Sequence, residues 1–278
     1  MSSYYTAEEG SISERDWESA EEYLPGNDEH HDGATQQEPA EEDDPELAAV
    51  KEHMRKVMYR QDTFTNGYDL RQWDPFPRKE MATDEEIVLN LIEDGVTRTV
   101  SMPMIPFFAA SPVFQDHMLG DPAAIILNVD NKDITVEAMS TLAQWLRDIC
   151  KQDVVQPIPI PTEFIRAMKL RLAAHKFGMH QYVNHIDAKY LQRVAAVFPE
   201  PWEIDAVLRY TADEEEDDVR LLAAVANRIA YLYRYNKVPQ SKRTLYQRVL
   251  ADAEYARYQR LVQEDVVQAM AAGDRRGG

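Results

Sequence analysis

An Asp-Gly pair between two short apolar runs constrains the fold of this chain more than any other feature. Residues 86–101 read EIVLNLIEDGVTRTVS, with Asp94 and Gly95 at the centre. Asp-Gly is favoured in the two-residue turns that join antiparallel strands, because both turn positions need a positive backbone φ angle. The sequence therefore predicts a β-hairpin over residues 86–101.

The segment after the hairpin, MPMIPFFAASPVFQDHML, is apolar but interrupted by prolines. Pro103 and Pro106 limit any helix to short pieces, because proline has no amide hydrogen to donate in a helix interior. Ser111 can cap a new helix, and Pro112 suits the first position of that helix. We therefore expect two short helices between the hairpin and the next strand.

A third strand and a series of helices are predicted downstream. The run AAIILNV, residues 123–129, contains three consecutive large aliphatic residues, which favours a strand buried on both faces. Apolar residues at helical spacing then predict a helix over residues 134–149. After a proline-rich loop, Thr162 can cap a further helix that Gly178 ends, and another helix is expected over 179–196.

The first 44 residues carry most of the net charge. They hold fifteen Asp and Glu residues against the single basic residue Arg15, which accounts for −14 of the net charge of −19. Such a segment buries too little apolar surface to offset chain entropy, so residues 1–44 are predicted to be a disordered acidic tail. Within it, Trp17, Ala20 and Leu24 form a candidate docking motif; the alternative is a solvated tail with incidental aromatics.

Helices are expected on both sides of the central block. Residues 45–83 are interpreted as an N-terminal helix over 45–60 followed by an ordered loop, because Asp44 can cap a helix and Pro45 suits its first position. Residues 197–271 predict a C-terminal helical extension with helices at 201–210, 217–236 and 241–271, and residues 272–278 are expected to be disordered.

Composition and motifs argue against a catalytic site. Cys150 is the only cysteine, which excludes an intramolecular disulfide framework and fits a reducing compartment, the cytoplasm or the nucleus. No secretory leader or membrane span is predicted. A metal-dependent enzyme using His175 and His180 stays open as an alternative, although helical residues five apart point about 140° away from each other. We expect no catalytic residue, no cofactor and no metal.

The C-terminal region from Arg228 to Arg260 is locally basic. No zinc-finger, homeodomain or RNA-recognition signature accompanies this charge, so it is interpreted as a solvated face or as an intramolecular partner for acidic segments. We expect no nucleic-acid partner.

Two motifs and the order of the elements resemble the BTB/POZ domain, a mixed α/β interaction fold, and above all the small divergent fungal BTB proteins. AASPVF is similar to the alanine-rich segment of the family that ends on Ser-x-x-Phe, here Ser111 and Phe114, where the serine caps a helix and the aromatic ring fills the core. LRLAAHKFGM is similar to the paired-helix segment of the family, a pattern that falls here on Leu172, Ala173, Ala174, Phe177 and Met179. The match runs from residue 84 to about 190, and residues 84–196 are assigned to this BTB/POZ-like domain.

The fold class that follows is α/β in the α+β sense: a small mixed sheet with helical hairpins and a helical extension. The resemblance implies a non-catalytic protein-interaction module that forms a homodimer, or serves as an adaptor for protein partners, through apolar helix faces. The expected interface residues lie on the first helix and are Leu47, Val50, Met54 and Val57.

A related branch of the same fold, the ubiquitin-ligase adaptor that links a cullin to F-box proteins, is the alternative. ILNV, AQWL, PWEI and TADEEEDDVR are similar to stretches of that linker. The hydrophobic-x-Glu element of cullin-binding members is not evident in HMLGDP, and MPMIP replaces the basic-flanked histidine that many family members carry.

Overall fold

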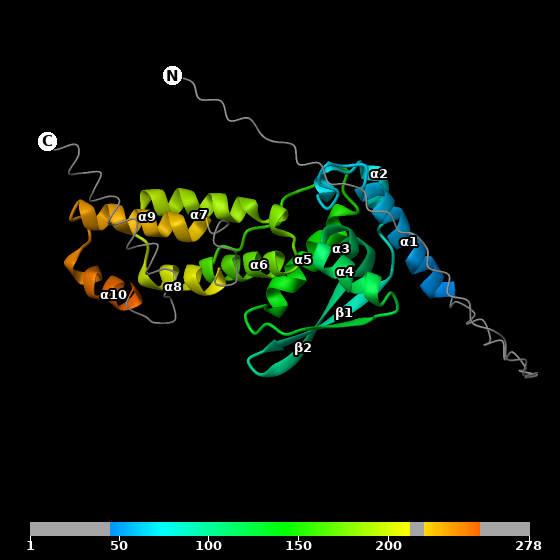
Figure 1. Ribbon diagram of the computed structural model, residues 1–278, viewed down its shortest axis with the longest axis horizontal. Helices are drawn as coiled ribbons and strands as arrows, with labels where there is room; N and C mark the ends of the chain where they lie inside the picture. The colour runs from blue at the N-terminus through cyan, green and yellow to red at the C-terminus, as the bar shows by residue number, and fades with distance from the viewer. Residues whose placement is uncertain (1–44, 212–219, 251–278) are drawn as a thin grey trace, which may run out of the picture. The chain divides into compact units, whose positions relative to one another are not determined.

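The computed structural model describes residues 45–211 and 220–250 as a mixed α+β fold, in which helices pack against a small sheet that lies at the edge of the molecule (Figure 1). The predicted acidic tail lies outside the described residues, as do Trp17, Ala20 and Leu24. The helices and strands of the first part are α1 (Pro45–Gln61), α2 (Pro75–Glu80), β1 (Glu86–Glu93), β2 (Val96–Pro103), α3 (Met104–Ala110), α4 (Pro112–Gly120), β3 (Ile126–Val129) and α5 (Val136–Ile149). The second part consists of α6 (Phe164–Lys176), α7 (Asn184–Ala196), α8 (Pro201–Tyr210), α9 (Arg220–Arg234) and α10 (Gln240–Leu250).

The predicted hairpin is confirmed. β1 and β2 pair antiparallel from Glu86 opposite Pro103 to Glu93 opposite Val96. Asp94 and Gly95 form the turn with φ angles of 52° and 76°, which is the left-handed backbone region that this pair of residues adopts readily.

The sheet has the strand order β2-β1-β3, with β3 parallel to the central strand β1. Its inner face carries Ile87, Leu89 and Leu91, which are completely buried. On its outer face, the side chain of Asn90 donates a hydrogen bond to that of Asn128 (2.9 Å). The sheet therefore packs on one side only.

The prediction that residues 123–129 are buried on both faces is wrong. Strand β3 covers only residues 126–129, and Ile125 and Ile126 are 66% and 51% exposed. The physical reason is the strand order: β3 lies at the edge of the sheet, so no strand covers its outer side among the described residues. An apolar run alone does not distinguish a central strand from an edge strand.

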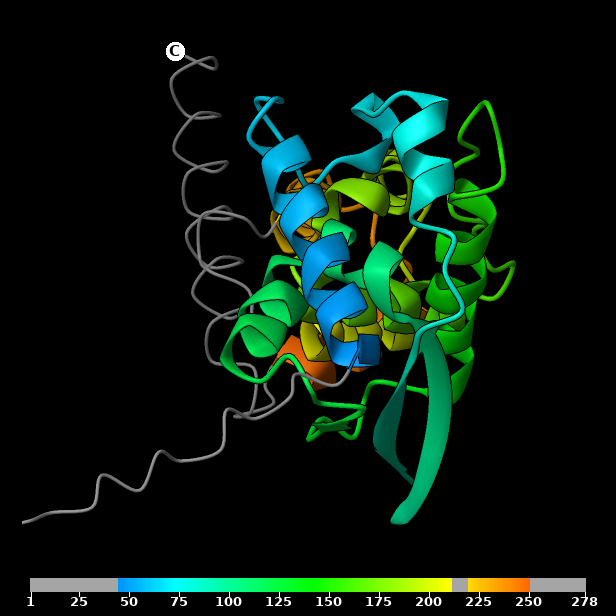
Figure 2. The ribbon, with the colours of Figure 1, turned by 90° about the vertical axis from the view of Figure 1, so that its right-hand side faces the viewer.

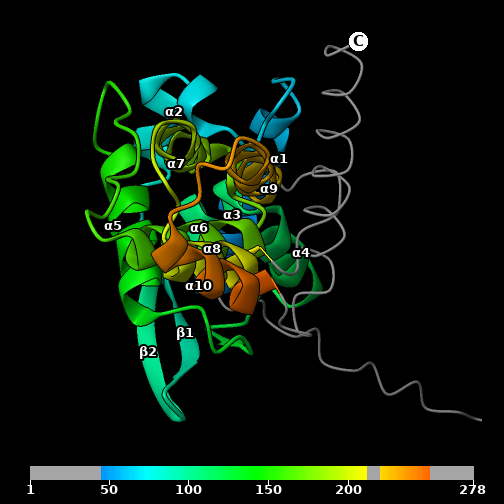
Figure 3. The same ribbon diagram turned by 90° about the vertical axis from the view of Figure 1, so that its left-hand side faces the viewer.

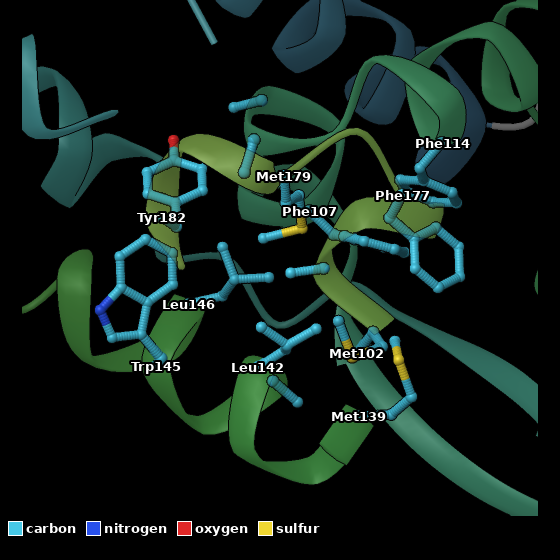
Figure 4. Packing of buried hydrophobic residues seen from close by; sticks show 14 of the residues in the cluster. Met102, Phe107, Phe114, Met139, Leu142, Trp145, Leu146, Phe177, Met179 and Tyr182 are labelled. Carbon is cyan, nitrogen blue, oxygen red and sulfur yellow. The ribbon is translucent and has the colours of Figure 1, made fainter. Parts of the chain in front are cut away.

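The first hydrophobic core lies between the inner face of the sheet and helices α1, α3, α4, α5 and α6. Figure 4 shows Phe107, Phe114 and Phe177 grouped on one side of this core, with Leu142, Leu146 and Met179 near its centre. The rings of Phe107 and Phe114 stack with centroids 4.3 Å apart, and Phe177 meets Phe107 edge to face at 5.1 Å. Such aromatic pairs stabilise the folded state beyond the contribution of their buried apolar area.

A second core joins α6 to the C-terminal helices. Met168 and Leu172 of α6 contribute to it together with apolar residues of α7, α8, α9 and α10. α7 packs on α9 and α8 packs on α10, as Figure 3 shows. The predicted C-terminal helices are thus present over 201–210, 220–234 and 240–250. Residues 235 and 236, which were expected in the second helix, form a turn, and residues 217–219 and 251–271 lie outside the described residues.

Two details differ from the expected helices. Thr162 does not cap α6, because the helix begins one residue later, after Glu163, and no side chain caps it. The helix expected over 179–196 is broken into a short 3-10 turn at His180–Tyr182 and α7. The break falls at Val183, whose φ and ψ angles of −114° and 2° lie outside the helical region.

The expected loop at 61–83 contains the short helix α2, held by a buried arginine. The guanidinium of Arg78 donates hydrogen bonds to the carbonyls of Trp73 (3.0 Å), Gln152 (3.0 Å) and Asp153 (2.8 Å). These bonds tie α2 to the loop after α5, because a buried guanidinium needs acceptors for its donors. They fix the position of α2 beside α1.

Candidate protein-interaction surface

The residues of the Ser-x-x-Phe motif come together with the end of α6. The hydroxyl of Ser111 accepts a hydrogen bond from the amide of Phe114 (3.0 Å) and donates one to the carbonyl of Phe177 (2.7 Å). Ser111, Phe107 and Phe114 are completely buried. The predicted cap is therefore confirmed, and the same hydroxyl also joins α4 to the end of α6.

The paired-helix segment is also placed at this junction. Ala173 and Ala174 are completely buried, as is Met179, while Leu172 points into the second core. A Cβ atom added to Gly178 would stand 2.6 Å from Cγ of Pro112, so glycine is required both by its φ angle and by this close approach. These motif residues thus serve the packing of the fold, and none of them forms a binding surface.

Three of the four residues expected at an interface are covered by their own chain. Val50, Met54 and Val57 lie on the face of α1 that packs on α3, and each is less than 9% exposed. The side-chain amide of Gln61, Nε2, donates a hydrogen bond to the carbonyl of Ala109 in α3 (3.0 Å). This bond fixes the C-terminal end of α1 on α3. The expectation that these three side chains are free to contact a second chain is therefore corrected; Leu47 remains partly exposed.

The opposite face of α1 is open to solvent. Figure 2 shows α1, in blue, lying across the side of the molecule that faces the viewer, with α2, in cyan, towards its C-terminal end. Small residues, Ala48 and Ala49, are exposed near the N-terminal end of this face. Met58 and Tyr59 are exposed near the C-terminal end, Tyr59 by 74%. We call this open face, together with the two grooves that flank it, the α1 face.

The first groove, which we call the basic groove, lies between the C-terminal half of α1 and α2. It has a volume of about 440 Å³. Its apolar walls are formed by Val57, Trp73, Pro77, Met81 and Ile105, and its polar residues are His53, Arg55, Lys56, Arg60 and Glu80. Three permanent cations and one carboxylate therefore surround an apolar floor, and two of the cations, Arg55 and Lys56, also pair with Glu52 on the same helix (2.8 Å and 3.8 Å).

The second groove, which we call the acidic groove, lies at the N-terminal end of α1 and has a volume of about 800 Å³. Its charged residues are all acidic: Glu46, Asp84, Glu85 and Glu86. Its apolar residues come from α1 and from the segment before β3, and include Pro45, Leu47, Ala49, Pro122 and Ile125. This groove includes Ile125, one of the two isoleucines that the edge position of β3 leaves exposed.

Carboxylates in or beside both grooves form hydrogen bonds and ion pairs with neighbouring side chains, and these lower their pKa values. The guanidinium of Arg55 donates two hydrogen bonds of 2.8 Å to Glu52, and these bonds lower the pKa of the Glu52 carboxyl. In the acidic groove, hydrogen bonds from Ser101 and Arg147 lower the pKa of Glu86. Both carboxylates are therefore ionised at neutral pH. Arg60 makes no ion pair with another described residue, which leaves its charge available at the rim of the basic groove.

The structure brings the two candidate catalytic residues together, because the chain leaves the helical conformation at Gly178 between them and the separation of about 140° in a continuous helix does not apply. The rings of His175 and His180 lie 5.9 Å apart, and no group of three His, Cys, Asp or Glu among residues 45–211 and 220–250 could hold a metal ion. Cys150 is buried, and burial raises the pKa of its thiol to about 12. None of the described helices combines the length and the apolar character that crossing a membrane requires.

The two grooves were not anticipated from the sequence. The cations of the basic groove are visible as a charged stretch on the first helix, but its floor comes from the loop and from α2 and α3. The acids of the other groove come from two separate segments, one on α1 and one that runs into the first residue of β1. The tertiary packing of α1 brings these segments together. Comparison of the chain with protein-family models, with curated proteins and with solved structures found no match.

Proposed function

We propose that the protein is a non-catalytic interaction module of BTB/POZ type that associates with a second copy of itself through the α1 face. The observation that carries this proposal is the opposite charge of the grooves at the two ends of one exposed helix. The cytoplasm or the nucleus is its proposed compartment, since the only cysteine is a free thiol.

A two-fold axis that lies in front of the open face, perpendicular to α1 at its midpoint, makes this face complementary to itself. Such an axis runs the two α1 helices antiparallel, so that the N-terminal end of each lies against the C-terminal end of the other. Every contact in such an interface therefore occurs twice. The basic groove of one copy then meets the acidic groove of the other, twice per dimer. The exposed alanines of one copy meet Met58 and Tyr59 of the other, so that small side chains lie opposite large ones.

The helix is long enough to organise an interface of ordinary size. Its 17 residues span about 25 Å. Stable interfaces bury on the order of 800 Å² on each partner, a patch about 30 Å across. The α1 face, with the two grooves beside it, therefore provides the area that a specific dimer needs.

The order of elements also supports the proposal. A hairpin, two short helices, a third strand and a pair of helices follow each other as in the resemblance on which the BTB/POZ prediction rests. The third strand joins the sheet parallel to β1 rather than forming a separate layer.

The experiment is a concentration series of the full chain by light scattering. We expect a monomer–dimer equilibrium that Tyr59→Glu shifts towards monomer by a factor of about 1,000 in Kd, because each buried tyrosine side chain contributes about 2 kcal/mol and a two-fold dimer contains Tyr59 twice. The matched control is Val154→Glu, which changes a residue that is 72% exposed and lies outside both grooves. A wild-type chain that stays monomeric at all concentrations contradicts the proposal, as does an equal effect of the two substitutions.

A further inference from the structure

The basic groove has the chemistry of a receptor for an acidic peptide. Its apolar floor lies under a rim that carries Arg55, Lys56 and Arg60. Exposed Tyr59 stands beside these cations and offers an aromatic surface at the same rim. A ligand that matches this arrangement has carboxylates on either side of one or two large apolar side chains.

The sequence contains one segment with this composition. Residues 14–25 read ERDWESAEEYLP and hold five acidic residues against one arginine, around Trp17, Tyr23 and Leu24. We propose that the basic groove binds the segment of residues 14–25 of the same chain. The carboxylates of the segment pair with the cations of the rim, and an aromatic side chain of the segment covers the apolar floor.

The intervening chain is long enough for this contact. The 19 residues from 26 to 44 can span up to about 60 Å when fully extended. The groove begins near His53, about 12 Å along the helix from Pro45. A linker of this length holds the segment at an effective concentration in the millimolar range, so a weak contact suffices.

The inference rests on the proposed function in one respect: the basic groove is also half of the α1 face. A groove filled by the segment of its own chain is closed to the acidic groove of a second copy. The segment therefore opposes self-association, and its removal from the groove strengthens the dimer.

The test is intramolecular cross-linking in the dilute full chain. One cysteine replaces Ser19 in the segment and a second replaces Glu80, which lines the groove. The matched control pairs the same Ser19→Cys with Thr97→Cys, at an exposed position in the hairpin. The native Cys150 is buried and does not interfere. We expect the groove pair to form its disulfide about fivefold faster than the control pair at low salt, and at the same rate in about 1 M salt, where charges are screened within about 3 Å.

A second variant keeps the outcome independent of folding. Trp17→Ala should abolish the excess cross-linking, whereas Tyr4→Ala, an aromatic substitution outside the segment, should leave it unchanged. Equal rates for the two cysteine pairs at low salt overturn the inference, and so do cross-links that join two chains. The cross-linking rates are measured on monomers, so they test the contact of the segment with the groove independently of the proposed dimer. Light scattering tests the dimer separately, and there Trp17→Ala should lower the Kd of self-association.

Discussion

Replacing Ser111 with alanine tests the role of the residue at which α4, the core and the end of α6 meet. The hydroxyl makes two hydrogen bonds, one from the amide of Phe114 and one to the carbonyl of Phe177. Alanine fills the same space apart from the oxygen, so the substitution removes both bonds and leaves no cavity larger than one atom. The effect is thus almost purely one of hydrogen bonding.

The expected cost follows from these two bonds. Loss of a side-chain cap costs about 1 kcal/mol. The buried carbonyl of Phe177 loses a donor, which adds about 1–3 kcal/mol if no water replaces it. We therefore expect Ser111→Ala to lower the free energy of unfolding by about 2–4 kcal/mol, measured by urea denaturation and followed by circular dichroism.

The chain offers a control with the same cap and only one of the two bonds. Thr135 is buried and caps α5 by accepting a hydrogen bond from the amide of Ala138 (3.3 Å). We expect Thr135→Ala to cost about 1 kcal/mol. Equal losses for the two substitutions would refute the argument that the Ser111 hydroxyl holds α4 to the end of α6.

Three further predictions concern buried groups. Gly178→Ala should cost about 2 kcal/mol or more in urea denaturation, because the new Cβ is strained at φ 68° and stands 2.6 Å from Pro112; an unchanged midpoint contradicts this. Asp187→Ala should lower the free energy of unfolding by about 3–5 kcal/mol, because Arg171 is buried and its Nε lies 2.5 Å from Oδ1 of Asp187. Replacing both residues by apolar ones should lower it by less. Because burial raises the pKa of Cys150 to about 12, only the unfolded chain loses the thiol proton between about pH 9 and 12, so stability falls as pH rises through this window. Cys150→Ala should reduce that slope by about 1.4 kcal/mol per pH unit, and identical slopes would show that the thiol does not contribute.

Local sequence signals predicted the elements whose geometry depends on near neighbours. Asp94-Gly95 fixed the hairpin because the turn requires positive φ angles at adjacent residues. Ser111 and Pro112 predicted the start of α4 because a cap is a contact over three residues. The helix at 45–60 was found to within one residue for the same kind of reason.

The remaining features depend on contacts between distant segments. The exposure of Ile125 and Ile126 follows from the edge position of β3, which local periodicity does not encode. The buried stripe of α1 was recognised as apolar, but its helical spacing is the same whether the stripe meets α3 or a second chain. The two grooves arise where α1 meets α2 and the start of β1, so no single stretch of sequence contains either of them.

The most direct measurement of self-association uses two charge-reversed chains. One variant carries Lys56→Glu and Arg60→Glu in the basic groove, and the other carries Asp84→Lys and Glu85→Lys in the acidic groove. Alone, each variant sets like charges against each other in a two-fold dimer, so sedimentation equilibrium should find mainly monomer. Mixed, the two variants restore opposite charges at both contacts, and a heterodimer with about the wild-type Kd is predicted. A mixture that remains monomeric while the wild-type chain dimerises would contradict pairing through the α1 face, and so would variants that dimerise alone as tightly as the wild type.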